Sequence, residues 1–326
     1  VIDKHGISRI GASRLGGAVI FASWLGLLLA GYFSDYFGDE LGGPSGPYWI
    51  VWIAVGSCTF LGLAEDLRNN YLNPRFRLYA QLGIFAVTIG VWPLLIPTDF
   101  GVPILDGLMR LPLIGWLLSV IFCVGFVNSI NMADGANGLM AGVITIAFSL
   151  FYASTGQFVY AAMMTACAVF TIFNIISGRL FLGDAGTYGL GSSVVICSLY
   201  LFQENIFSAA FLACLFSYPC IDFMMTLARR LRAGRSIYLP DNDHLHNRIH
   251  YHFQRWLPSK TLANSMTGGL IVASSSGVTL VGYIFQWWSV TSNLWIWLFS
   301  AQCVSYGVVF YLTGFGRANT QYEYRT

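Results

Sequence analysis

Hydrophobic residues are gathered into ten stretches of 17 to 22 residues, separated by polar intervals. A helix needs about 20 apolar residues to cross the hydrocarbon core of a bilayer, so each stretch is long enough for one span. The stretches cover residues 15–33, 47–64, 78–96, 111–127, 138–155, 157–176, 186–202, 206–227, 265–286 and 293–313. The pattern predicts an all-α polytopic integral membrane protein. Its single transmembrane domain covers 1–326, and its longest polar interval is the loop 228–264.

The composition excludes several other classes of protein. Charged residues make up 10% of the chain and hydrophobic residues 56%. An average soluble domain has about 25% charged residues, and a disordered chain needs low hydrophobicity and high charge. The net charge of +2 is too small to indicate nucleic acid as a partner.

The charges are divided unevenly between the two sides of the predicted bundle. When the polar intervals are assigned alternately to two sides, 16 of the 17 lysines and arginines fall on one side, and only Arg110 falls on the other. The positive-inside rule makes the basic side cytoplasmic. All five histidines are also on that side, whereas Asp222 is the one charged residue inside a stretch. A channel would place ionisable groups along the midplane, so this distribution disfavours one.

Two acidic features on the cytoplasmic side are candidates for metal or phosphate chemistry. Glu65 and Asp66 end the second stretch and can bind a divalent cation, although a solvated helix end is the alternative. Asp184 follows Gly183 at the start of another stretch, where glycine lets backbone approach a phosphate and helix N–H groups favour anions. A Mg²⁺ ion bridging Asp184 and that anion would explain the carboxylate, but capping of the helix is about as good an explanation.

Asparagine and aspartate recur after the fourth predicted span. Asn128, Asn131 and Asp134 are spaced by three residues, and Asn137 follows. The pairs Asp134-Gly135 and Asn137-Gly138 favour a turn, so a short loop should point these side chains inward. An asparagine amide offers both a donor and an acceptor and can read the edge of a base or sugar. Ordinary turn chemistry is the alternative.

The loop 228–264 is rich in basic residues and contains His244-Leu-His246 and Arg248. If residues 243–256 are helical, an apolar stripe forms that can lie on the membrane surface; it consists of Leu245, Ile249, Phe253 and Trp256. The histidines and Arg248 are suited to bind a diphosphate. The alternatives are a topology signal without a catalytic part and, less favoured, a zinc site at His246 and His250, which lacks the glutamate of an HExxH motif.

Together these features resemble one family, the polyprenyl-phosphate N-acetylhexosamine-1-phosphate transferases, or membrane-type glycosyltransferase family 4. The matching pieces occur in the family's order; they are Arg14-Leu-Gly-Gly17, Glu65-Asp66, Asn128-x-x-Asn131-x-x-Asp134-Gly, Gly183-Asp184-x-Gly186 and His244-Leu-His246. Members commonly have ten or eleven spans, so we expect a further span before Val1. The departures are Glu65 in place of an aspartate, Asn137 in place of a frequent second aspartate, and Asn247 in place of a further histidine. Asn137 makes the chain similar to the O-antigen, capsule and enterobacterial-antigen branch.

The resemblance implies an activity. A polyprenyl (undecaprenyl) phosphate would attack the β-phosphorus of a UDP-N-acetylhexosamine, with Mg²⁺ as cofactor and Mn²⁺ as an alternative ion, to give polyprenyl-diphosphate-sugar and UMP. The active site would lie on the cytoplasmic face of a bacterial inner membrane, and a homodimer is compatible with the resemblance. The implied catalytic residues are Asp66, Glu65, Asp184, His244, His246 and Arg248, with Asp184 and Asp66 on the metal. The implied nucleotide or substrate contacts are Asn128, Asn131, Asp134, Asn137, Gly183 and Arg14. A transporter, or a lipid-linked-sugar binding protein without phosphotransfer, is the competing hypothesis.

Overall fold

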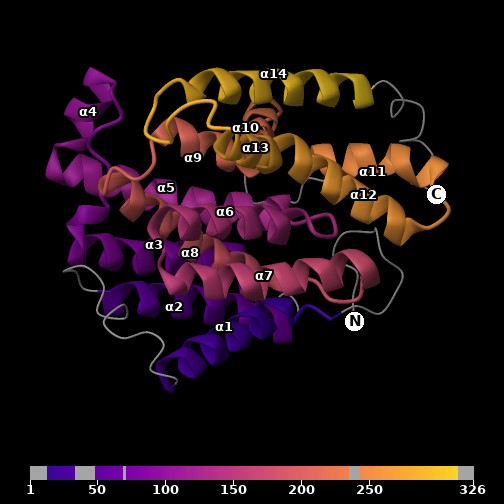
Figure 1. The fold of residues 1–326 in the computed structure, drawn as a ribbon, viewed down its shortest axis with the longest axis horizontal. Coiled ribbons are helices and arrows are strands. Elements are labelled where there is room, and N and C mark those ends of the chain that lie inside the picture. The colour runs from indigo at the N-terminus through magenta and orange to yellow at the C-terminus, as the bar shows by residue number, and fades with distance from the viewer. Residues whose placement is uncertain (1–12, 34–47, 69–70, 235–242, 315–326) are drawn as a thin grey trace.

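The computed structural model describes residues 13–33, 48–68, 71–234 and 243–314, and these residues form helices joined by short connections (Figure 1). The long helices are α1 (Gly16–Phe33), α2 (Tyr48–Leu67), α3 (Pro74–Val91), α5 (Pro112–Ala133), α6 (Leu139–Thr155), α7 (Phe158–Ser177), α8 (Gly183–Gln203), α10 (Ser217–Arg232), α11 (Leu245–Trp256), α12 (Lys260–Val272) and α14 (Trp295–Gly314). The short elements are η2 (Pro93–Leu95), α4 (Pro103–Met109), α9 (Ala209–Leu215), the π-helical turn η3 (Ala273–Gly277) and α13 (Val278–Ile284).

Each of the ten apolar stretches coincides with a helix or with a pair of consecutive helices. Six of these units, among the described residues, are long and apolar enough to span a membrane: α2, α5, α7, α8, α12 through α13, and α14. The helices α9 and α10 make a seventh span if they are counted together, although an 81° bend separates them. The helices α1 and α6 are shorter apolar helices, and α3 begins with Arg75 and Arg77. The prediction of an all-α polytopic membrane protein is confirmed.

The helix α8 lies at the centre of the bundle. Of its most apolar 18 residues, 89% are buried inside the protein, whereas the corresponding share for α14 is 11%. Two glycines let neighbouring helices approach the first turn of α8 backbone to backbone. A Cβ atom at Gly17 would lie 2.1 Å from the amide nitrogen of Gly186, and one at Gly62 would lie 2.2 Å from the carbonyl oxygen of Asp184. The start of α8 is therefore held between α1 and α2.

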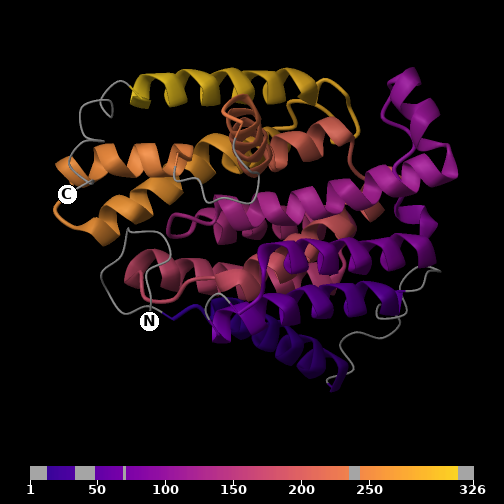
Figure 2. The same cartoon turned by 180° about the vertical axis from the view of Figure 1, so that it is seen from behind.

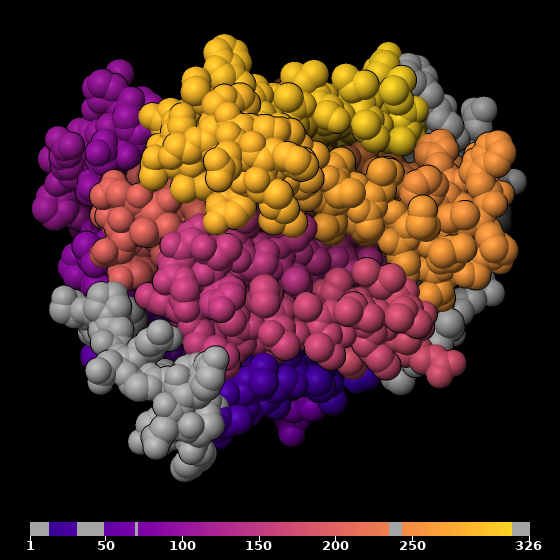
Figure 3. Space-filling view, in the orientation of Figure 1, coloured from indigo at the N-terminus to yellow at the C-terminus, as the bar shows by residue number. Residues whose placement is uncertain are grey.

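The outside of the bundle is apolar. Large side chains such as Phe60 and Ile176 remain about three-quarters exposed, at 73% and 76%. Figure 3 shows the face on which α6 and α7 lie beside the helices from α12 to α13. A surface of this kind suits lipid, because a soluble monomer rarely exposes large contiguous apolar patches.

The described parts of the polar intervals that were assigned to the basic side lie at one end of the bundle. Figures 1 and 2 show this end marked by α11, with α4 at the opposite end. There the segment after Ser13 runs beside residues 179–182: the Ser13 amide donates to the Arg179 carbonyl, and the Gly16 amide donates to the Phe181 carbonyl, both at 3.0 Å. Segments far apart in the sequence thus share one polar end.

The predicted helix over 243–256 is present as α11, although the expectation for its apolar stripe is partly wrong. Leu245 and Ile249 are buried in the protein core, and only Trp256 is strongly exposed, at 85%. The first turns of the stripe therefore pack against the bundle, where α12 and α14 contact α11. Residues 240–242 of the predicted loop motif lie outside the described residues.

Candidate active site

The acidic pair at the end of α2 is not a solvated helix end. Glu65 is 1% exposed. Its Oε2 accepts a hydrogen bond from the Leu72 amide at 3.0 Å, and its Oε1 lies 3.9 Å from Nη1 of Arg77. Glu65 therefore ties the connection between α2 and α3 to the first turn of α3.

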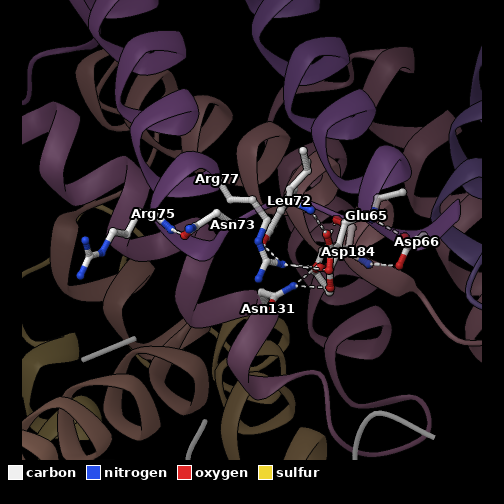
Figure 4. A network of polar contacts seen from close by, with 11 residues as sticks. Glu65, Asp66, Leu72, Asn73, Arg75, Arg77, Asn131 and Asp184 are labelled. Carbon is white, nitrogen blue, oxygen red and sulfur yellow. Dashed lines mark hydrogen bonds and ion pairs between the residues drawn. The ribbon is translucent and has the colours of Figure 1, made fainter. Parts of the chain in front are cut away.

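Asp66 caps the start of α8 from a neighbouring helix. Its Oδ1 accepts from the Asp184 amide at 3.0 Å, and its Oδ2 accepts from the Ala185 amide at 2.8 Å (Figure 4). The first amides of a helix have no partner within the helix, and a carboxylate there also complements the positive end of the helix dipole. A carboxylate therefore caps the start of α8, but it belongs to Asp66 and not to Asp184.

Gly183 makes this capping sterically feasible. Its φ is +70°, and a Cβ atom would lie 2.2 Å from the Arg14 carbonyl oxygen and 2.5 Å from Oδ2 of Asp66. A side chain at this position would be strained and would displace the carboxylate. The structure thus brings Arg14, Asp66 and Gly183 together through backbone contacts.

Asp184 points from the first turn of α8 toward α3 and α5. Its Oδ2 accepts from Nη1 of Arg77 at 2.8 Å, and its Oδ1 accepts from Nδ2 of Asn131 at 3.2 Å. Asn131 also donates to Oγ1 of Thr187 at 2.7 Å. Figure 4 shows Arg77, Asn131 and Asp184 converging from three helices. The residue is 8% exposed, so these contacts fix the direction of its carboxylate.

Asp134 adds negative charge to the same region. It follows the last residue of α5, and burial together with the charges of Asp184 and Asp66 raises the pKa of Asp134 from 3.8 to about 7. Like charges at close range disfavour ionisation of each other. A cation that contacts the carboxylates would relieve this repulsion, so the donor set has the charge and oxygen chemistry that Mg²⁺ prefers.

No group of three or more His, Cys, Asp or Glu residues is arranged to hold a metal without a substrate, within the part of the chain that the structure describes. Mg²⁺ usually takes only one or two carboxylates and completes its shell with water and substrate phosphates. Both oxygens of Asp66 already accept amide hydrogen bonds. Both oxygens of Asp184 also accept hydrogen bonds, and a carboxylate oxygen that accepts one hydrogen bond keeps a lone pair for a metal ion, so Asp66, Asp134 and Asp184 are all candidate ligands.

The other two members of the asparagine series point elsewhere. Asn128 donates from Nδ2 to Oε1 of Gln81 at 2.7 Å. Asn137 is 3% exposed; its Nδ2 donates to Oγ of Ser265, and its Oδ1 accepts from Nδ2 of Asn264, both at 3.2 Å. Asn137 therefore ties the loop to α12, and only Asn131 and Asp134 lie with the acidic cluster.

The histidine motif reaches the same loop from the other side. Nδ1 of His246 lies 2.8 Å from the Tyr218 hydroxyl, and a Cβ atom at Gly135 would lie 2.0 Å from Nε2 of His246. The ring of His244 stacks on that of His246, with centroids 5.2 Å apart. The turn that holds Asp134 therefore lies between the acidic cluster and the two histidines.

Arg248 is occupied by protein partners. Its Nε and Nη2 both donate to the Asp243 carboxylate at 2.8 Å, and its Nη1 donates to the Phe310 carbonyl at 2.7 Å. The guanidinium also lies 3.6 Å over the Phe310 ring. The bidentate geometry expected for a diphosphate is formed with Asp243, and the contact fastens α11 to the end of α14.

Two residues at the site were not identified from the sequence. Arg77 joins Asp184 to Glu65, and Asp222 accepts from His244. A signal existed for Asp222, because an acid within a span is costly unless paired, whereas Arg77 lies in the polar interval before residue 78, where the sequence does not distinguish it from Arg75.

Comparison with known proteins gives relatives of one kind. Residues 48–202 match the family described as glycosyl transferase family 4. The chain is 27% identical over 248 residues to a probable undecaprenyl-phosphate N-acetylglucosaminyl 1-phosphate transferase of Bacillus subtilis, covering 72% of this chain and 65% of that protein. It is 27% identical over 303 residues to a phospho-N-acetylmuramoyl-pentapeptide-transferase of Synechococcus, covering 87% and 81%. A decaprenyl-phosphate N-acetylglucosaminephosphotransferase of Mycobacterium tuberculosis is also 27% identical, over 264 residues, covering 72% and 62%. The chain thus spans less than two thirds of the first and third of these relatives.

Proposed function

We propose that this chain, whose residues 48–202 match glycosyl transferase family 4 and which is similar to transferases that act on polyprenyl phosphate, transfers N-acetylhexosamine 1-phosphate from a UDP-sugar to polyprenyl phosphate. The products are polyprenyl-diphosphate-sugar and UMP. The observation that carries the proposal is the meeting of Asp66, Asp134 and Asp184 at the polar end of the bundle, beside His246. A lipid phosphate at headgroup depth and a soluble nucleotide can meet only at such an end.

The chemistry favours positioning over proton removal. An oxygen of the lipid phosphate forms a bond to the β-phosphorus while the bond from that phosphorus to the α,β-bridging oxygen breaks, and this oxygen leaves with UMP. A phosphate monoester has a second pKa of about 6, so the nucleophile is mostly dianionic at pH 7 and needs little help from a base. The harder task is to bring two anions together, which calls for fixed positive charge.

The residues of the site divide this task. Asn131 and Arg77 hold the Asp184 carboxylate in one direction, and Asp66 holds the helix turn from which Asp184 projects. His244, whose ring stacks on that of His246, offers a ring nitrogen to the diphosphate. Asp66, Asp134 and Asp184 are the candidate ligands of Mg²⁺, which supplies positive charge to phosphate oxygens when it is bound.

The orientation and the pathway are part of the proposal. The excess of basic residues in the intervals near the site supports a cytoplasmic active-site face in a bacterial inner membrane. Asn137 supports the O-antigen, capsule and enterobacterial-antigen branch, in which the product would begin a surface glycan.

The experiment is direct. Purified protein is incubated with Mg²⁺, undecaprenyl phosphate and a panel of UDP-N-acetylhexosamines, and both UMP and the lipid product are measured. We expect release of UMP with at least one sugar and its loss in Asp184→Asn, which keeps the side-chain shape and removes the charge. The matched control is Asp106→Asn, because Asp106 is also buried and accepts from an amide, that of Phe100 at 2.7 Å, near the opposite end of the bundle. Binding of lipid-linked sugar or solute uptake without UMP release would instead favour a binding protein or a transporter.

A further inference from the structure

An aspartate inside the bundle has partners on three other segments. Asp222 lies on α10 and is 0% exposed. Its Oδ2 lies 2.5 Å from Nδ1 of His244, and its Oδ1 accepts from the Tyr306 hydroxyl at 2.7 Å and from the Leu245 amide at 3.2 Å. A buried charge is costly unless it is paired and hydrogen bonded, and here both carboxylate oxygens are engaged.

The second histidine has its own buried partner. The His246 amide donates to the Tyr218 hydroxyl oxygen at 3.3 Å, and that hydroxyl lies 2.8 Å from Nδ1 of His246. A hydroxyl has one hydrogen, and its oxygen already accepts from the amide, so the arrangement that satisfies both groups has Tyr218 donating to Nδ1. The proton of a neutral His246 ring is then on Nε2, which faces Gly135.

The two stacked rings are therefore held by different chemistry. Nδ1 of His244 faces a carboxylate, which requires a proton on that nitrogen, whereas Nδ1 of His246 faces a hydroxyl. Tyr306 comes from α14, and Asp222 and Tyr218 come from α10, one turn apart. His244, Tyr306 and the Leu245 amide together offset the cost of burying the Asp222 carboxylate.

We propose that Asp222 is the positioning residue for His244: its carboxylate holds Nδ1–H, so that Nε2 is presented to the diphosphate of the lipid and nucleotide substrates. This inference rests on the proposed function. A carboxylate bonded to one ring nitrogen fixes the orientation and tautomer of an imidazole and stabilises positive charge on the ring. Positive charge is what a diphosphate requires of its donors.

The test is a double-mutant cycle between Asp222→Asn and His244→Ala, read by UMP release. Loss of the partner of a working histidine costs about 10- to 100-fold, and we expect this loss in kcat with KM little changed. In the His244→Ala background the same change should cost almost nothing more, because residues that act as a unit are not additive. Ser276→Ala is the control: Ser276 is also buried and donates to the Leu215 carbonyl at 2.7 Å, so its effect should be the same in both backgrounds.

A spectroscopic measurement separates this inference from the proposed function. In protein labelled with ¹⁵N-histidine, the Nδ1 resonance of His244, assigned by its loss in His244→Ala, should move in Asp222→Asn. The resonance of His250, which faces α12, should stay in place. An unmoved His244 resonance, or equal losses of kcat in both backgrounds, would overturn the role of Asp222. Wild-type protein that releases no UMP would overturn the proposed function, while the resonance would still decide whether Asp222 holds His244.

A variant with a smaller perturbation covers failure of Asp222→Asn to fold. Tyr306→Phe removes one hydrogen bond to Asp222 and leaves the carboxylate in place. We expect a loss in kcat of several-fold, about 1 kcal/mol for one hydrogen bond, that disappears in the His244→Ala background. The same loss in both backgrounds would mean that Tyr306 and Asp222 only support the fold.

Discussion

Replacing Asp66 by asparagine tests the most demanding contact of the site. The carboxylate accepts from two amides at the start of α8, at 3.0 Å and 2.8 Å. Hydrogen bonds to a charged group are worth about 1.5–3 kcal/mol each, so the pair is worth about 3–6 kcal/mol. Asparagine keeps one neutral acceptor, worth about 1 kcal/mol, and turns an NH₂ group toward the other amide. The net local loss is therefore about 2–5 kcal/mol.

This loss falls on the helix turn that carries Asp184. Each 1.4 kcal/mol is a factor of ten, so we expect kcat/KM for UMP release to fall by about 30- to 4,000-fold. The comparison is Glu65→Gln. That change keeps an acceptor for the Leu72 amide and weakens the 3.9 Å contact with Arg77, so about tenfold is expected from a loss of about 1–2 kcal/mol.

The assay follows UMP from detergent-purified variants whose monodispersity matches that of the wild type. Asp106→Asn, an equivalent change near the opposite end of the bundle, should leave turnover close to normal. If Asp66→Asn retains activity within a few-fold, or if Glu65→Gln is equally damaging, then capping of α8 does not control the placement of Asp184.

Three further outcomes are expected. Arg77 contacts Asp184, Tyr188 and Glu65 through a single nitrogen, Nη1, so one positive charge at this point should be enough. Arg77→Lys should therefore stay within about tenfold of normal turnover, while Arg77→Gln should lose more than about 100-fold. Equal losses in the two variants would show that the planar guanidinium itself is needed. Gly183→Ala should lower the free energy of unfolding by about 2–5 kcal/mol, from the cost of a positive φ plus overpacking against the Arg14 carbonyl; an unchanged thermal midpoint would contradict this. Removal of divalent ions with EDTA should stop UMP release, and Mg²⁺ should restore it; full turnover in EDTA would rule out the metal.

The local pattern of the sequence was enough to predict much of this protein. The ten apolar stretches are helical because a run of about 20 apolar residues in a membrane must satisfy its backbone hydrogen bonds within itself. Assigning the polar intervals alternately to two sides predicted that Asp66, Asn131, Asp184 and His246 lie at one end of the bundle. The helical spacing of Leu245, Ile249, Phe253 and Trp256 also predicted where α11 forms.

Which atoms meet was decided by the tertiary structure alone. Asp66 and Asp184 are 118 residues apart, and only the close packing of α2 on α8 at Gly62 turns one into the cap of the other. Asn137 and Arg248 carry groups that suit a nucleotide or a diphosphate, but in the structure Asn137 hydrogen bonds to α12 and Arg248 hydrogen bonds to Asp243. Asp222 was visible as an acid in a span, but its partner depends on how α11 folds back over α10. Periodicity determines which face of a helix is polar, whereas the direction of a side chain and its partner depend on packing between segments that the sequence does not place side by side.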